Sequence, residues 1–351
     1  MLWINLFFIL SLNAAELPAF LTKHSSDTLR YVSYNGRITY LQKKPGLLAL
    51  VSDFKSTDVL NEKFNNDFRI TGSSAKKRLI IESIPNSQSD LSFLKNHEIF
   101  VVDYGNSLPR KIGQGKNPKL HLSDEWLSYF DLSKKIIHLQ NLMTEKKYEI
   151  KPTQELNPFF TPEIQMVNSQ SVVYSDVNES GHSAIVSFNF ITQNSTILYK
   201  SPHKGTKIEI CRGVDYLGFG EFPYEGLFRN SQIQLSKTSE TEELSGFTML
   251  YESVNGDNGN MICLKDHIYF IKTTDQNSEI NHRTTEAAKI NLKDQKLEVL
   301  SNLKNVSQII EMDGRVMIPF RGEFYVLEGH SDLREDKLKA NPTQEEAPLD
   351  I

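Results

Sequence analysis

The stretch GQGKNPKLHLSDEWLSYFD, residues 113–131, contains the pattern that predicts the fold. Asn117-Pro118 precedes a short apolar segment, a polar turn and an aromatic segment that ends in Asp131. Forty residues later Asn157-Pro158 opens a second copy, which ends in Tyr174-Ser175-Asp176. A repeat of about 40–50 residues without helical periodicity is typical of propeller blades, each of which is too small to bury its own apolar face.

Strand patterns fill the chain from Leu29 to Gly329 and predict an all-β fold. Tyr31–Tyr34, Asn35-Gly36 and Arg37–Leu41 form a hairpin pattern, because Asn-Gly favours the positive φ angles of a tight turn. Groups of strand patterns begin near residues 30, 67, 118, 158, 207, 258 and 306. They predict a β-propeller of about seven four-stranded blades, or six if the first hairpin completes the last blade and so closes the ring.

Around the first Asn-Pro motif the sequence predicts two separate strands, Pro109–Ile112 and Lys119–Leu122. Pro118 lies directly before the second strand, where its missing N–H removes no ladder hydrogen bond. Ser123-Asp124 follows that strand, and its side chains can accept hydrogen bonds from the backbone of a tight turn.

The composition and the two ends of the chain predict its compartment. A net charge of −5 and an isoelectric point near 6.0 over 351 residues argue against nucleic acid as a partner and give no attraction to an anionic membrane. Residues 1–15 are predicted as a secretory signal, because Leu2–Leu12 is apolar but too short to span a bilayer of ~30 Å. The other interpretation of this segment is a buried first strand.

With that signal removed, we expect a periplasmic or secreted protein without a stable membrane span. Residues 16–329 then form the propeller domain. Residues 330–351 are polar and acidic with few apolar side chains, which predicts a disordered tail.

Cys211 and Cys263 are the two cysteines, and they lie about one repeat apart in similar settings. They are therefore expected on equivalent strands of adjacent blades. An exported protein permits a disulfide, but this needs Cα atoms within about 7 Å of each other. The sequence slightly favours buried free thiols over this disulfide. No spacing typical of zinc ligands is present.

A resemblance to a known family is carried by Ile112-Gly113, Asn117-Pro118 and Leu122–Phe130, which resemble the WD40-like β-propeller repeat of TolB-type proteins. In the second copy, Thr161-Pro162-Glu163 takes the place of the repeat's Ser-Pro-Asp. The repeat-motif positions of this chain are Asn117, Pro118, Ser123, Asp124, Asn157, Pro158, Pro162 and Asp176. The resemblance covers roughly residues 98–199 and implies an exported propeller that binds partners through its faces or its channel. The N-terminal α/β domain of TolB itself is expected to be missing, because too few residues precede Leu29.

Motifs for catalysis are few. The sequence contains neither Gly-x-Ser-x-Gly nor a phosphate-binding glycine loop. Gly218–Gly226 combines aromatic residues with Glu221 and Glu225, and these carboxyls, with Asp176, are the candidates for cleaving a glycosidic bond. A Glu shielded among aromatic rings would have a raised pKa, which suits a general acid. The structural alternative is a strand packed between blades, in which glycine allows close approach.

Other polar residues have simpler interpretations. Asp53, Asp131 and Asp176 end strands of three blades, where they either face a common channel or cap hairpins. Asp176–Gly181 resembles the start of a calcium loop but lacks the distal bidentate Glu, so we expect a hairpin turn and no metal. His121 and His138 alternate with apolar residues on strands and point either to a channel or to solvent, and the preferred interpretation is polar residues of the surface.

The sequence therefore predicts an exported binding or scaffold module of the cell envelope, since loops held on a rigid frame suit recognition. The expected partner is an envelope or extracellular protein, or a glycan, and no cofactor is expected. The alternative is a secreted carbohydrate-active enzyme, a glycoside hydrolase or lyase. Such an enzyme would need two or three carboxylates that converge in a deep pocket.

Overall fold

The computed structural model describes residues 32–34, 37–44, 47–52, 55–60, 67–73, 78–84, 95–103, 108–121, 125–152, 161–177, 180–223, 230–238, 247–253, 256–257, 259–274, 284–300, 304–312, 315–320 and 323–327. Every regular element in these ranges is a β-strand, and the 26 strands form antiparallel sheets. The predicted all-β fold is confirmed.

Each sheet is a meander, in which strands that follow one another in the sequence also pair in space. The first sheet contains β1 (Val32–Tyr34), β2 (Arg37–Lys44), β3 (Leu47–Ser52) and β4 (Lys55–Leu60). The predicted pairing of the first two strands is confirmed, because Tyr34 pairs with Arg37. This hairpin continues into β3 and belongs to its own sheet.

The second sheet is larger because one strand serves two four-stranded halves. It contains β5 (Asp67–Ser73), β6 (Arg78–Ile84), β7 (His97–Asp103), β8 (Arg110–His121), β9 (Trp126–Asp131), β10 (Ile136–Asn141) and β11 (Lys147–Ile150). β8 pairs with β7 through its first half and with β9 through its second half.

The prediction of two separate strands around Asn117-Pro118 is wrong, because β8 runs through both without a break. Asn117 has a φ of 52°, and the register with β9 shifts between Lys116 and Lys119. Asparagine tolerates this left-handed conformation better than most residues. The motif therefore bends one strand from the outer edge of one half-sheet to the inner edge of the next.

The remaining four sheets begin within a few residues of the predicted group starts near 158, 207, 258 and 306. One contains β12 (Ile164–Met166), β13 (Ser171–Val177), β14 (His182–Asn189) and β15 (Ser195–Lys204), and the next contains β16 (Thr206–Arg212), β17 (Tyr216–Pro223), β18 (Ser231–Lys237) and β19 (Thr248–Ser253). The third contains β20 (Gly259–Leu264), β21 (His267–Thr274), β22 (Thr284–Asn291) and β23 (Leu297–Val299), and the last contains β24 (Ile310–Met312), β25 (Arg315–Phe320) and β26 (Glu323–Leu327).

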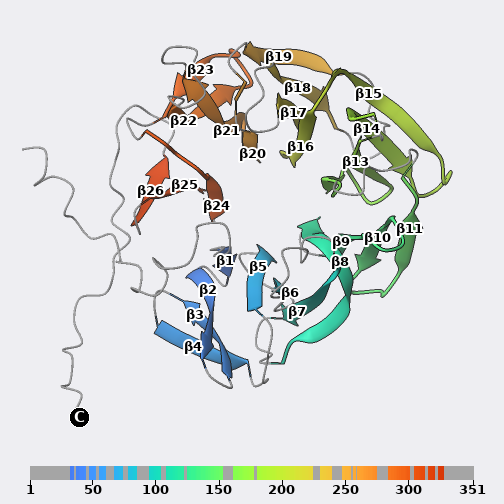
Figure 1. Ribbon diagram of the computed structural model, residues 1–351, viewed down its shortest axis with the longest axis vertical. Coiled ribbons are helices and arrows are strands. Elements are labelled where there is room, and N and C mark those ends of the chain that lie inside the picture. Colours follow the sequence, from blue (N-terminus) through green and yellow to red (C-terminus); the bar gives the residue numbers. More distant parts are fainter. Residues whose placement is uncertain are drawn as a thin grey trace, which may run out of the picture.

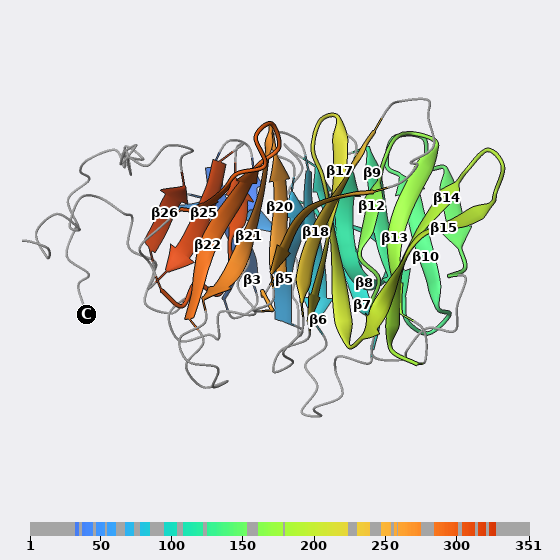
Figure 2. The ribbon, with the colours of Figure 1, turned by 90° about the horizontal axis from the view of Figure 1, so that it is seen from above.

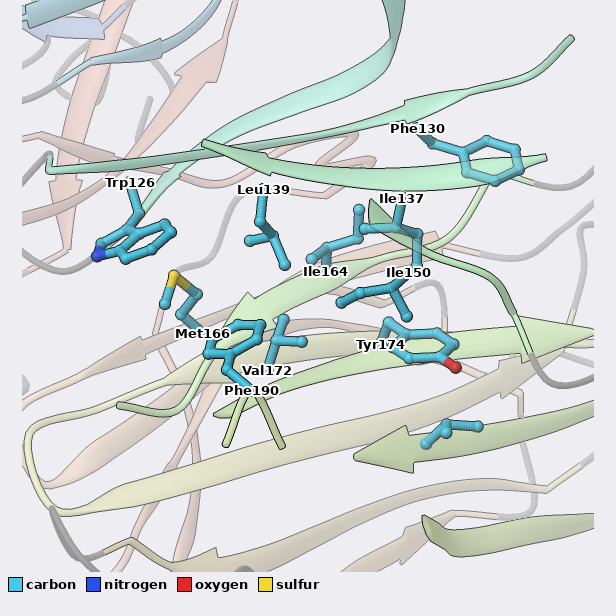
Figure 3. Packing of buried hydrophobic residues seen from close by; sticks show 11 residues of the cluster. Trp126, Phe130, Ile137, Leu139, Ile150, Ile164, Met166, Val172, Tyr174 and Phe190 are labelled. Carbon is cyan, nitrogen blue, oxygen red and sulfur yellow. The ribbon is translucent and has the colours of Figure 1, made fainter. Parts of the chain in front are cut away.

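The core lies between neighbouring sheets rather than at the centre of the molecule. Figure 3 shows side chains of β9–β11 facing those of β12–β14. The cluster contains Trp126, Phe130, Ile137, Leu139, Ile150, Ile164, Met166, Val172, Tyr174, Val186 and Phe190. Similar buried clusters lie at other sheet boundaries of the described part. In this part of the chain neighbouring sheets therefore bury apolar side chains against each other, as expected of a repeat that cannot stand alone.

The sheets are arranged around a common axis (Figure 1), and the strands run across the thickness of the molecule (Figure 2). The first strand of each sheet lies nearest the axis in Figure 1. Neighbouring inner strands contact each other, β12 with β16 and β16 with β20, and β1 lies beside β24 of the last sheet. Inner strands from distant parts of the sequence therefore lie around the axis.

Several predictions fall outside the described residues. They concern the signal segment 1–15, the tail 330–351, and the positions Asp53, Ser123, Asp124, Asn157, Pro158 and Glu225. Within the described ranges, no helical segment has the length and hydropathy that a membrane crossing requires.

Candidate functional site

An open cavity of about 460 Å³ lies among the inner strands. Its lining comes from β8, β12, β16, β20 and the chain around the start of β24. The polar lining residues are Lys119, Gln165, Arg212, Asn260, Gln308 and Glu311. Isoleucines, Met261 and the two cysteines form the apolar part of the wall. The cavity is thus assembled from residues almost 200 positions apart in the sequence.

Lys119 lines this cavity and makes few hydrogen bonds. Its one hydrogen bond within the described residues runs from Nζ to the carbonyl oxygen of Ile210, at 3.5 Å. Burial lowers the pKa of Lys119, and the negative charges of Glu163 and Glu209 offset part of this effect. Neither carboxyl lies close enough to form an ion pair with it.

Arg212 ends β16 and also lines the cavity. Its Nε atom is buried and has no hydrogen-bond partner among the described residues. Burial lowers the pKa of Arg212. A buried cationic donor without an acceptor is unfavourable, because it loses water without a replacement.

His121 lies close to both cations and is buried, so its interpretation as a surface residue is wrong. Its Nε2 lies 2.7 Å from Ser128 Oγ, and its Nδ1 accepts a hydrogen bond from the Met166 N–H at 3.4 Å. Burial, together with the charges of Lys119 and Arg212, holds the pKa of His121 well below its ordinary value. The imidazole is therefore neutral near pH 7. His138, by contrast, is partly exposed and stacks on Tyr129.

A disulfide forms one wall of the cavity. Cys211 on β16 and Cys263 on β20 are bonded, with 5.3 Å between their Cα atoms, so the preference for free thiols is wrong. The two strands are the inner strands of adjacent sheets, as the repeat spacing predicted. Gly218 pairs with Cys211, and a Cβ atom at Gly218 would lie 3.2 Å from the Cys263 sulfur. This glycine therefore leaves room for the bridge.

Glu221 is not part of the cavity lining. Its side chain is fully buried, and its carboxyl oxygens accept hydrogen bonds from Tyr199, Ser201 and Gln232, the last at 2.5 Å. Tyr199 and Ser201 belong to β15 of the neighbouring sheet. Burial, followed by the hydrogen bond to Glu221, raises the pKa of Tyr199 well above its ordinary value. The carboxyl thus links two sheets, which is the structural role considered for this strand.

The other carboxyl candidates lie apart from one another. Asp176 is fully buried on β13, opposite Ala184 of β14. Asp131 accepts hydrogen bonds from Asn96 at 2.8 Å and from the backbone and hydroxyl of Ser133, and so caps the turn after β9. Burial tends to raise the pKa of Asp131, but these hydrogen bonds outweigh it, and the pKa is lowered. Within the described residues, no three His, Cys, Asp or Glu side chains lie close enough together to hold a metal ion.

The repeat motif joins one sheet to the next. The Asn117 side chain donates hydrogen bonds to the Pro162 carbonyl at 3.1 Å and to Glu163 Oε1 at 3.3 Å. The Glu163 N–H donates to Ser175 Oγ at 2.8 Å. The first Asn-Pro motif is therefore bound directly to the Thr-Pro-Glu of the second copy.

The sequence did not point to a buried polar chain in the second sheet. His97 Nδ1 lies 2.6 Å from Glu82 Oε1, and its Nε2 lies 2.6 Å from Lys116 Nζ. All three residues are buried, on β7, β6 and β8 respectively. Lys116 immediately precedes Asn117, so the strand pattern around the motif was the one available signal. None of the three residues is among those that line the cavity, and their hydrogen bonds satisfy buried polar groups of the sheet.

No family model and no curated protein matches the sequence. Solved structures do resemble it. The tricorn protease has a TM-score of 0.54 at 13% identity, over 86% of this chain and 34% of that chain. An uncharacterized protein from Listeria monocytogenes has a TM-score of 0.55 at 9% identity, over 87% of this chain and 95% of that chain.

The tricorn protease, like a prolyl endopeptidase that this chain also resembles, contains a propeller. The chain has a propeller-type fold. It spans less than half the length of the first solved structures it matches. A putative TolB from Agrobacterium tumefaciens has a TM-score of 0.38 at 9% identity, over 68% of this chain and 84% of that chain. Identities this low concern the fold alone.

Proposed function

We propose that this protein is an exported propeller of seven blades that acts as a binding or scaffold module of the cell envelope. The blades are the four-stranded groups β1–β4, β5–β8, β8–β11, β12–β15, β16–β19 and β20–β23, with β24–β26 as the last. The contact of β1 with β24 supports a ring in which the first and last blades meet. The repeat motif shared with TolB-type proteins supports the same reading.

The observation that carries the binding function is the chemistry of the cavity at the axis. Its wall contains two cations, three amides and a single carboxyl, that of Glu311. A glycosidase needs two carboxyls about 5–10 Å apart on either side of the bond that it cleaves. The candidate Glu221 is instead occupied between two sheets by three donors. A cavity with this lining suits holding a ligand.

Export is supported by two independent features. Leu2–Leu12 has the apolar composition of a signal segment. The Cys211–Cys263 disulfide is of the kind that persists in an oxidising compartment such as the periplasm. We therefore propose that the protein works outside the cytoplasm, with an envelope or extracellular protein or a glycan as its partner.

The proposal is tested by capture from the envelope fraction of the source organism with the tagged mature protein, followed by mass spectrometry. A partner that copurifies reproducibly from that fraction, and not from the cytosolic fraction, is expected. The competing function, a glycoside hydrolase or lyase, is tested by reducing-sugar release from a polysaccharide panel. Release that Glu221→Gln abolishes in a folded variant would contradict the binding module.

A further inference from the structure

The geometry points to an anion site in the axial cavity, in which Lys119 and Arg212 together hold an oxyanion group, a carboxylate or a phosphate, of the ligand. This inference rests on the proposed binding function and gives the chemistry of what is bound. The ligand class is defined by that oxyanion and by an adjoining apolar part, because isoleucines form much of the remaining wall.

Within the described residues, neither Lys119 nor Arg212 has a counter-ion. Lys119 has one long hydrogen bond, to the Ile210 carbonyl at 3.5 Å, although an ammonium group offers three donors. Arg212 has a buried Nε without any acceptor. Partly buried cations are commonly paired, and a ligand oxyanion would supply the acceptor that the buried Nε of Arg212 lacks.

The positive charges of Lys119 and Arg212 act on the same part of the cavity, around His121. Lys119 comes from β8 and Arg212 from β16, two strands that do not pair with each other. Both line one cavity, and both lower the pKa of the buried His121. Because His121 is kept neutral there, it adds no competing cation and no negative charge.

The carboxyl groups of Glu163 and Glu209, whose charges act on Lys119, have other hydrogen-bond or ion-pair partners. Glu163 accepts a hydrogen bond from Asn117 at 3.3 Å. Glu209 pairs with Lys207 at 2.9 Å and accepts the Met261 N–H at 2.7 Å. Glu311 is the acid of the lining itself, and it is exposed, so solvent screens its charge. Glu163 and Glu209 form no ion pair with Lys119 or Arg212 in the described part of the chain, so both cations keep donors for an incoming anion.

The volume and the polar lining of the cavity limit the size and shape of the ligand. A volume of about 460 Å³ falls in the range of about 300–1,000 Å³ that small-molecule sites occupy. The planar guanidinium presents parallel N–H groups that match the two oxygens of a carboxylate or phosphate. The amides of Gln165, Asn260 and Gln308 line the same cavity and can contact the rest of the ligand.

The test titrates the full mature chain with inorganic phosphate and with N-acetyl-alanyl-alanine by calorimetry, at constant ionic strength and against sodium chloride. We expect saturable one-to-one binding of at least one probe and none of chloride. Arg212→Gln and Lys119→Gln should each weaken this binding about tenfold or more. Arg212→Lys keeps the positive charge but loses the parallel N–H groups of the guanidinium. This variant should weaken anion binding less than Arg212→Gln does. The exposed Lys237→Gln is the matched control and should bind as the wild type does.

Two results would overturn the site. One is the absence of saturable binding of both probes to the wild type, and the other is equal binding by Arg212→Gln. The urea midpoint without probe gives a second readout, because removing an unsatisfied cation should leave it unchanged or raise it. A lower midpoint for Arg212→Gln would mean that the guanidinium is already satisfied, which contradicts the proposal. Calorimetry needs no protein partner, so the anion site and the envelope partner stand or fall separately.

Discussion

At the scale of single residues, Glu221 holds three donors at the boundary between two sheets. Its carboxyl accepts hydrogen bonds from Tyr199 and Ser201 of one sheet and from Gln232 of the next. A buried acceptor that serves several donors is costly to change, since each donor left without a partner loses its water as well. Glu221 should therefore matter first for stability.

We expect Glu221→Gln to lower the free energy of unfolding by about 2 kcal/mol, because the amide replaces an acceptor with a donor that faces other donors. The urea midpoint measures this loss. Glu125→Gln, at an exposed position, is the control and should change it by less than about 0.5 kcal/mol. An unchanged midpoint for Glu221→Gln would show that the three hydrogen bonds contribute nothing net.

Gly220 shows why an aromatic strand contains glycine. A Cβ atom there would lie 2.3 Å from the ring of Phe222, which is fully buried and cannot move aside. We expect Gly220→Ala to cost about 1–3 kcal/mol through overpacking. Gly218→Ala should cost less, because its nearest neighbour, at 3.0 Å, is the end of the Ile268 side chain. Chemical denaturation of both variants would check the order, and the reverse order would contradict the packing account.

At the scale of elements, the disulfide and the Asn-Pro motif join sheets that share few hydrogen bonds. The Cys211–Cys263 bridge links β16 to β20 across a sequence separation of 52 residues. Asn117 links β8 to the chain before β12. Each therefore fixes the position of one sheet relative to the next.

Replacing Cys211 and Cys263 together by Ala should lower stability by about 2–4 kcal/mol, because the unfolded chain gains the freedom of a long loop. Urea unfolding with and without dithiothreitol measures this. The reductant should destabilise the wild type by a similar amount and leave the double variant unaffected. A reductant effect on the variant would point to another cause.

Asn117→Ala should cost about 1–3 kcal/mol, because alanine loses the contacts with Pro162 and Glu163 and adopts a φ of 52° with strain. Asn117→Gly loses the same contacts but adopts this φ freely, so its loss should be smaller. Thermal unfolding of the two variants separates the contacts from the backbone strain. Equal losses would mean that strain contributes nothing.

At the scale of the whole molecule, stability should fall as the pH drops below about 6.5. The folded protein keeps the pKa of His121 well below the value of an unfolded histidine, so below pH 6.5 the unfolded chain binds a proton that the folded chain refuses. Asp257 acts in the opposite direction, because burial raises its pKa in the folded state. The contribution of His121 is therefore best isolated by substitution.

We expect His121→Gln to reduce the pH dependence of stability between pH 6.5 and 5.5 by up to about 1.4 kcal/mol per pH unit. Urea midpoints at pH 7.5, 6.5 and 5.5 measure it. The exposed His203→Gln should leave the dependence as it is in the wild type. A wild-type slope retained in His121→Gln would assign the effect to other groups.

The sequence by itself determined the strands, the turns and the repeat. A strand pattern depends on alternation between neighbouring residues, and a turn such as Asn35-Gly36 depends on the φ angles of two residues, so both can be read locally. The repeat spacing also placed Cys211 and Cys263 on equivalent strands. It did not foresee that β8 continues through Asn117, because a bend and a break leave the same local pattern.

Only the tertiary structure decided which side chains meet. Lys119 and Arg212 share a cavity because their strands lie around one axis. Glu221 does not line that cavity, and its carboxyl group accepts a hydrogen bond from Tyr199 of the adjacent sheet. Strand patterns specify which face of a sheet a residue occupies, but not which sheet covers that face. Contacts between sheets depend on how all of them pack around the axis, and this arrangement is a property of the whole chain.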